Sequence, residues 1–127
     1  MTPLLRLVFP VLETTPQRWI QLAEKLSPEL FQRKPAPVEL AGEFAQLRAG
    51  SLAMLSKVGE DDLNRTARHQ ELGMVTLGEM LHEWAGHDLM HTVQGERAIL
   101  QPFIDGCGPW KRYFSDHTVP PPPQGGR

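Results

Sequence analysis

The chain has 127 residues, of which 40% are hydrophobic and 22% charged, as expected for one globular domain with a single apolar core. Thirteen basic and 15 acidic residues give a net charge of −2 with no basic block, which argues against nucleic-acid binding. The single cysteine, Cys107, cannot form an intramolecular disulfide, and no window has the unbroken apolar length of a membrane span. We therefore expect a cytoplasmic protein that contacts no membrane.

The first part of the chain mixes apolar residues with prolines. The N-terminal "MTPLLRLVFPVL" is not a signal peptide, because Arg6 and Pro10 interrupt its apolar run and no cleavage site follows. The first clear helix is predicted to begin at Thr15-Pro16, a capping residue followed by a proline at the first helical position. A short helical piece is expected from Ser27, and an extended break at "RKPAP", residues 33–37.

Two longer helices follow. The first is expected over residues 38–58, where an apolar stripe recurs at helical spacing: Leu40, Phe44, Leu47, Ser51, Met54, Leu55 and Val58. "RTARHQELGMV", residues 65–75, reads as a loop. Thr76 and Glu79 then form a capping-box pattern that opens a helix to about Leu100. A short helical turn is expected at "KRYF", residues 111–114. These features predict an all-α bundle, with one domain over residues 1–117 and an extended or disordered Pro/Gly-rich tail over residues 118–127.

Two histidines in the last long helix suggest metal chemistry. His87 and His91 are four residues apart, so their imidazoles stand one helical turn apart and can reach one divalent ion. His91 lies roughly 40° and Trp84 roughly 60° around the helix from His87, which places the pair at the edge of the face expected to pack inward. The alternative is that both are ordinary histidines of a helix surface or core.

Further polar residues near the pair are candidates for supporting roles. Asp88 and Gln94 could orient an imidazole or a bound water, and Glu83 could transfer a proton or bind the ion. His69, in the preceding loop, could supply a third ligand.

Two other features are weaker. "HEWAGH", residues 82–87, is not the zinc-protease pattern, because one residue too many separates its histidines. Cys107 stands between two glycines and could be a thiol nucleophile, but no neighbouring residue favours a lowered thiol pKa, so a structural or incidental cysteine is the preferred interpretation.

The segment "LGMVTLGEMLHEWAGHDLMHTVQGERAIL", followed by "GPWKRYF", resembles the DinB-like superfamily, also called the DinB/YfiT-like metalloenzymes. The resemblance covers a little over half of the chain, from about Glu43 to Phe114. It rests on three motifs in the family's order: His69, Gly73, Thr76 and Leu77; then His87, Asp88, His91 and Gln94; then Gly108, Pro109 and Trp110.

The resemblance implies a fold and a chemistry. The fold is an up-down four-helix bundle, often a homodimer, and the cofactor is nickel or zinc held by three histidines, two of them matching His87 and His91. Relatives include thiol transferases that use low-molecular-weight thiols and a mycothiol-dependent isomerase. The resemblance therefore implies a metal-dependent thiol transferase or hydrolase acting on a small molecule. The alternative is a non-catalytic dimerising or small-molecule-binding bundle with a decayed metal site. A role in DNA repair is suggested only by the family's name.

The chain departs from the family pattern at one point. The third histidine should come from an earlier helix, yet no histidine precedes His69 and the ligand helix is missing near Pro35 to Glu39. Either the protein has lost that helix or a segment between Pro37 and Val38 is absent from this sequence. Two imidazoles bind zinc or nickel more weakly than three, and a missing helix would leave an apolar groove that favours dimerisation.

Overall fold

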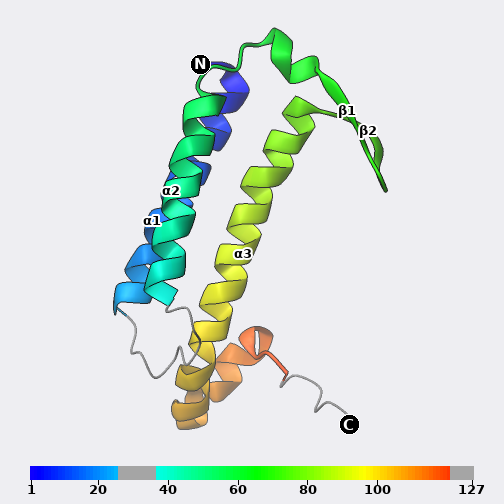
Figure 1. Cartoon of the computed structure of the whole chain (residues 1–127). Helices are drawn as coiled ribbons and strands as arrows, with labels where there is room; N and C mark the ends of the chain where they lie inside the picture. The colour runs from blue at the N-terminus through cyan, green and yellow to red at the C-terminus, as the bar shows by residue number, and fades with distance from the viewer. Residues whose placement is uncertain (26–36, 121–127) are drawn as a thin grey trace, which may run out of the picture. The chain divides into compact units, whose positions relative to one another are not determined.

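The computed structural model describes residues 1–25 and 37–120, which form an all-α bundle with one small β-hairpin (Figure 1). In chain order the elements are α1 (Pro3–Lys25), α2 (Pro37–Leu55), the 3₁₀ helix η2 (Asp61–Asn64), β1 (Thr66–His69), β2 (Gly73–Thr76), α3 (Leu77–Gly106) and the 3₁₀ helix η3 (Gly108–His117). The chain divides into two compact units, Met1–Met90 and His91–Arg127. Within the described ranges, no helix combines the length and hydropathy needed to cross a membrane. The helical piece predicted from Ser27, most of the predicted break at 33–37 and tail residues 121–127 fall outside the described residues.

Helix α1 begins at Pro3, so the prediction that the first helix starts at Thr15-Pro16 is wrong. Thr2 caps the helix, because its Oγ1 accepts a hydrogen bond from the backbone N–H of Leu5 at 3.1 Å. Proline at the first helical position costs nothing, since the N–H it lacks would have no helical partner there. The apolar N-terminal run is thus the start of a packed helix, and Leu5 and Val8 are almost fully buried.

Pro10 and Pro16 lie inside α1, where each removes a hydrogen-bond donor from the helix. The missing N–H of Pro16 would have bonded to the carbonyl oxygen of Leu12, four residues earlier. Nη1 of Arg48, on α2, donates to that oxygen at 3.0 Å instead. A side chain from a neighbouring helix therefore supplies the donor that Pro16 lacks, which is why a helix can continue past a residue that usually ends one.

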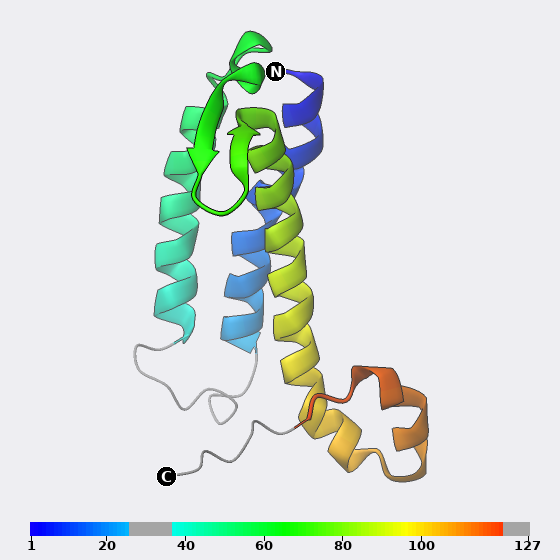
Figure 2. The same cartoon turned by 90° about the vertical axis from the view of Figure 1, so that its right-hand side faces the viewer.

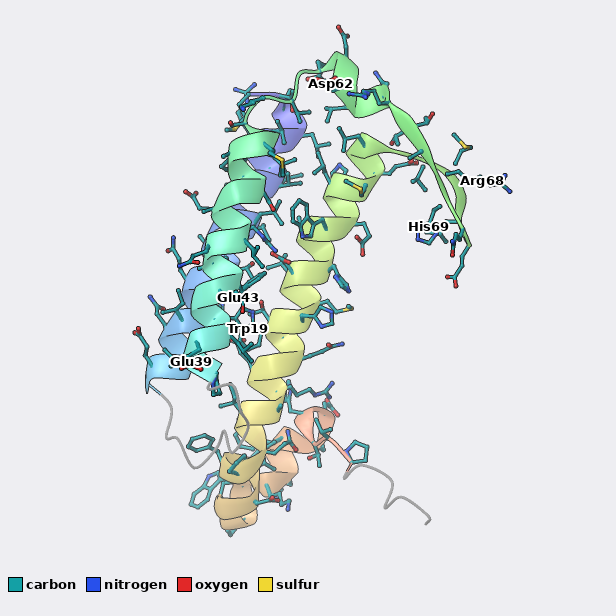
Figure 3. The ribbon with its side chains drawn as sticks, in the orientation of Figure 1. Trp19, Glu39, Glu43, Asp62, Arg68 and His69 are labelled. Atoms are coloured by element: carbon teal, nitrogen blue, oxygen red, sulfur yellow. The ribbon has the colours of Figure 1, made fainter. Side chains whose placement is uncertain are left out.

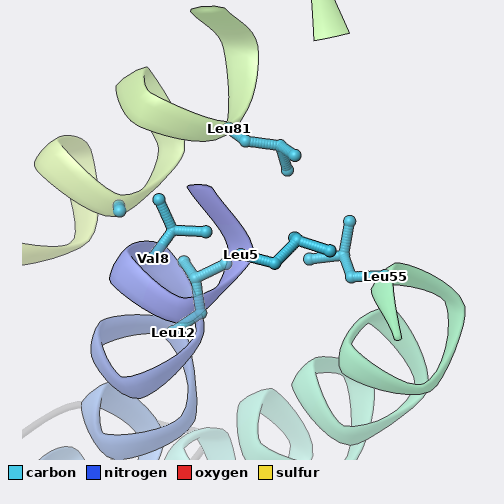
Figure 4. Close-up of a cluster of buried hydrophobic side chains, with 6 residues drawn as sticks. Leu5, Val8, Leu12, Leu55 and Leu81 are labelled. Carbon is cyan, nitrogen blue, oxygen red and sulfur yellow. The ribbon is translucent and has the colours of Figure 1, made fainter. Parts of the chain in front are cut away.

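The core of the first unit lies between α1, α2 and the beginning of α3. Helices α1 and α2 run antiparallel side by side (Figures 1 and 2), and their buried leucine and valine side chains meet Leu81 of α3 (Figure 4). The buried members are Leu5, Val8, Leu12, Leu55, Leu81 and Ala85. Each buried leucine stabilises the fold by about 1.5–3 kcal/mol relative to an exposed one.

Helix α2 buries only part of the predicted stripe: Leu55 is buried, and Phe44, Ser51 and Val58 are half-buried. Its buried residues are Ala41, Arg48 and Leu55, spaced by seven. Three of the residues predicted to face inward are largely exposed: Leu40 (49%), Leu47 (67%) and Met54 (67%). The inward face of α2 therefore includes the position of Arg48 and excludes the line of Leu40, Leu47 and Met54.

Residues 66–76 form an antiparallel hairpin, so the prediction of a loop over residues 65–75 is wrong. Strands β1 and β2 pair from Thr66 with Thr76 to His69 with Gly73, leaving a three-residue connection. Gly73 has φ of 81°, the left-handed conformation that short hairpin connections commonly need and that glycine adopts without strain. The strands have four residues each; β1 is wholly exposed and β2 has no fully buried residue, which explains why they lack the alternating apolar pattern of a strand with one buried face.

The predicted capping box at the start of α3 is confirmed. The backbone N–H of Glu79 donates to Oγ1 of Thr76 (3.1 Å), and the N–H of Thr76 donates to Oε2 of Glu79 (2.7 Å). The bond from the N–H of Thr76, and after it a bond from the Thr76 hydroxyl to the same carboxylate oxygen (2.9 Å), hold the pKa of Glu79 below its ordinary value. The helix ends at Gly106, passing through Pro102 instead of stopping near Leu100.

The second unit folds back on itself after α3. Helix η3 spans Gly108–His117, longer than the single turn predicted at residues 111–114. The side chain of Arg97 bonds to the carbonyl oxygens of Asp116 and His117, and Nε2 of Gln101 donates to the latter at 2.9 Å. Oε1 of Gln101 also accepts from the backbone N–H of Val119 at 2.9 Å. Two side chains of α3 thereby satisfy the carbonyls at the end of η3.

Candidate metal centre

Asp88, immediately after the first candidate histidine, lies in a buried ion pair. Nη2 of Arg48 donates to its Oδ1 at 3.0 Å and Nη1 donates to its Oδ2, so the guanidinium binds the carboxylate through two parallel bonds. Only 4% of Arg48 and 8% of Asp88 are exposed. This planar two-point geometry is the strongest form of the arginine–carboxylate interaction.

Two aromatic rings contact the guanidinium. The Cζ atom of Arg48 lies 4.9 Å from the ring centres of Phe44 and of Trp84, within the range of cation–π attraction. With the bond to the carbonyl of Leu12, Arg48 joins α1, α2 and α3. The Arg48–Asp88 ion pair therefore holds α3 in one rotation about its axis, with the Asp88 side chain directed toward the core.

Sequence reasoning missed Arg48, although one signal was available. It is the only charged residue among the buried positions of α2, seven residues from both Ala41 and Leu55. A lone arginine at the centre of a heptad-spaced small or apolar stripe indicates a buried partner of opposite charge, because an unpaired buried charge is very costly.

The two candidate ligands lie on the part of α3 that is not buried. His87 and His91 are both exposed, whereas Leu81, Ala85 and Asp88 are buried. The prediction that the histidines border the packed face therefore has to be corrected. The buried face is centred on Ala85 and Asp88, because Arg48 draws the aspartate inward and turns the adjacent His87 outward.

His91 has a defined hydrogen bond within the helix. Its Nδ1 donates to Oε1 of Gln94, one turn further along α3, at 2.9 Å. A histidine whose Nδ1–H is held in this way presents its Nε2 lone pair as the metal-binding nitrogen. The contact suits the supporting role expected of Gln94. The role expected of Asp88 stays a prediction, as does metal binding by the histidines.

The remaining candidates are in different surroundings. Glu83 is exposed on α3. His69 ends β1, at the turn of the hairpin (Figure 3), where its Nδ1 accepts from the backbone N–H groups of Glu71 and Leu72, both at 3.2 Å. Cys107 is partly buried, and its thiol donates to the carbonyl of Ile104 at 3.1 Å. The contacts of His69 and Cys107 are local, so they do not join these two residues and Glu83 in one site.

A closed three-ligand metal site would need three donor side chains directed to one point. Within residues 1–25 and 37–120, no group of three or more histidine, cysteine, aspartate or glutamate side chains has that arrangement. Both Asp88 oxygens bond to Arg48, and Nδ1 of His69 is engaged in its own turn. Among the described residues, the candidate ligands are therefore at most the two imidazoles of His87 and His91. Two nitrogen ligands are half of a tetrahedral site and fewer than the three protein ligands of a catalytic one.

Comparison with known proteins identifies one family. Residues 35–94 match the sequence profile of the DinB superfamily. The matched region includes α2 with Arg48, the hairpin, and α3 through Gln94. No curated protein matches the chain.

Proposed function

We propose that this chain, whose residues 35–94 match the DinB superfamily profile, binds a divalent metal ion through His87 and His91 of α3. Nickel and zinc are the expected ions, since both accept neutral imidazole ligands. The observation that carries the proposal is the exposed pair at i, i+4 spacing in one unbroken helix, with the second imidazole oriented by Gln94.

The Arg48–Asp88 pair supports the same proposal indirectly. Residue 88 is held inward by two hydrogen bonds, so residue 87 on the same helical turn points away from the bundle. A hydrogen-bonded partner on the imidazole then raises its basicity and reduces the conformational freedom lost when a metal binds. Gln94 does this for His91.

The reaction class proposed for a completed site is thiol transfer or hydrolysis on a small molecule, with a low-molecular-weight thiol as co-substrate in the first case. A bound divalent ion supplies Lewis acidity, which favours a thiolate or a deprotonated water. Such a site needs a third protein ligand, and the described residues group no third donor with the pair. No catalytic step is therefore assigned to side chains of this chain.

The test is the metal content of the untagged protein, measured by mass spectrometry of the metals after dialysis against zinc or nickel. We expect the His87→Ala and His91→Ala proteins to lose bound metal. His82→Ala is the matched control, because His82 is also exposed on α3 but points to another side of the helix. Metal content that stays unchanged in His91→Ala would rule out the proposal.

A second candidate function is a non-catalytic dimerising module. It is favoured by the exposed stripe of Leu40, Leu47 and Met54, whose seven-residue spacing on α2 is the pattern by which helices pair. A second copy of the chain could bury this stripe in an isologous contact. Such a dimer would form without metal and would be disrupted by Leu47→Lys, while the histidine variants would leave it intact.

A further inference from the structure

The connection of the β-hairpin is closed by a histidine side chain. His69 is the last residue of β1 and pairs with Gly73 at the start of β2. Its Nδ1 accepts hydrogen bonds from the backbone N–H groups of Glu71 and Leu72, both at 3.2 Å. A side-chain acceptor for nearby N–H groups of its own turn is the arrangement that asparagine and aspartate form in Asx turns. His69 takes the role of such a residue, but its acceptor atom can bind a proton.

This contact requires one form of the imidazole. Two N–H donors point at Nδ1 of His69, so this nitrogen carries the lone pair and the ring proton is on Nε2. Protonation of the ring places a hydrogen on Nδ1 as well, and a nitrogen that carries a hydrogen has no lone pair to accept a hydrogen bond. The side-chain oxygen of an asparagine would remain an acceptor under the same conditions.

We propose that protonation of His69 opens the hairpin connection, so that the turn from Gln70 to Leu72 is closed at neutral pH and open in mild acid. Histidine is the side chain that changes its charge in the range of roughly pH 5–8. The neutral ring stabilises the closed connection, and this contribution is lost as the pH falls and the ring binds a proton. The proposal concerns the hairpin alone and does not depend on metal binding by α3.

The charged groups close to His69 belong to the hairpin and its base. Figure 3 shows His69 at the end of the hairpin that lies away from the helices of the first unit. The neighbouring charged residues are Arg68 and Glu71, and at the base Arg65 lies 3.6 Å from Asp62 of η2 in an ion pair. Arg68 and Glu71 are exposed, so solvent and salt screen their effect on the ring. The two hydrogen bonds to Nδ1 therefore dominate the response of the connection to pH.

The base of the hairpin does not respond to the same proton. The backbone N–H of Leu77 donates to the carbonyl oxygen of Arg65 at 2.8 Å, next to the capping box of Thr76 and Glu79. The bond from the Thr76 N–H is the main reason that the pKa of Glu79 lies below its ordinary value. Its carboxylate therefore stays ionised where histidines bind protons. Opening is confined to the connection, and α3 keeps its first turn.

Nuclear magnetic resonance of the isotope-labelled protein measures each step between about pH 8 and about pH 5. At the upper end we expect the ring of His69 in the Nε2–H form, read from the shifts of its two nitrogens. On acidification, the amide signals of Glu71 and Leu72 should shift with the same midpoint as the ring. Their exchange with solvent, corrected for its intrinsic dependence on pH, should rise several-fold. The amides of Leu77 and Glu79 should not follow that midpoint.

Two variants separate this mechanism from others. His69→Asn keeps an acceptor at the same position and should hold the connection closed over the whole pH range. Glu71→Gln removes a carboxylate that a protonated ring could attract, and it should leave the response unchanged. Four results would each refute the proposal: a neutral ring in the Nδ1–H form, amides of Glu71 and Leu72 that ignore the midpoint of His69, the same response in His69→Asn, or a response abolished by Glu71→Gln.

Discussion

Replacing Arg48 by methionine tests the buried ion pair directly. Methionine keeps an unbranched apolar side chain beside Phe44 and Trp84, but it cannot donate to Asp88 or to the carbonyl oxygen of Leu12. Asp88, only 8% exposed, would lose both hydrogen bonds from the guanidinium and the positive charge that balances its own.

The expected loss follows from two terms. Breaking a buried ion pair by removing one partner costs about 3–5 kcal/mol. An unsatisfied carbonyl at Leu12 adds about 1–3 kcal/mol, because Pro16 provides no helical donor there. The terms are not fully additive, so we expect the free energy of unfolding to fall by about 4 kcal/mol, a large part of the roughly 5–15 kcal/mol typical of a domain.

The assay is urea denaturation followed by far-ultraviolet circular dichroism at neutral pH. Arg6→Met is the matched control, since Arg6 is exposed on α1 and should change stability by less than about 0.5 kcal/mol. Replacing both partners, Arg48→Met with Asp88→Leu, should recover most of the loss because no charge then stays buried. Adding Pro16→Ala should recover more, since it returns a donor to Leu12. A loss below about 1 kcal/mol for Arg48→Met alone would refute this reasoning.

Three further changes have expected outcomes. Thr2→Ala removes the cap of α1 and should lower the free energy of unfolding by about 1 kcal/mol in the same urea assay; no change would mean that the helix does not depend on its cap. Leu81→Ala creates a cavity in the core cluster and should cost about 2–5 kcal/mol, measured by thermal and urea unfolding. The lowered pKa of Glu79 means that its bonds to Thr76 stabilise the fold above the ordinary glutamate pKa of about 4.3 and are lost as pH falls through the lower folded value. Glu79→Gln should therefore flatten the dependence of stability on pH in that acidic window, and an unchanged acid transition would contradict the assignment.

The sequence alone determined the features that depend on neighbours a few residues apart. The capping box of Thr76 and Glu79 is confirmed because its bonds lie within one turn of helix. The all-α class also follows from local periodicity, and two of the three superfamily motifs, those from His69 to Leu77 and from His87 to Gln94, lie in the region that the family profile matches. Metal binding by His87 and His91 stays a prediction, since spacing along one helix does not supply a third ligand.

Tertiary structure decided which faces pack and which helices continue. The local rule for proline predicted a helix that begins at Thr15-Pro16. Instead α1 continues through Pro16, because Arg48 supplies the hydrogen-bond donor that the proline lacks. Arg48 lies 32 positions after Pro16 in the sequence. The most apolar stripe of α2 was predicted to be buried, yet Leu47 is exposed and Arg48 is buried. The free energy of an ion pair depends on a partner 40 residues away and on the rings that exclude water from it. No sequence pattern within one helix identifies such an ion pair. The orientation of His87 depends on this pair, because Asp88 is the next residue of the same helix.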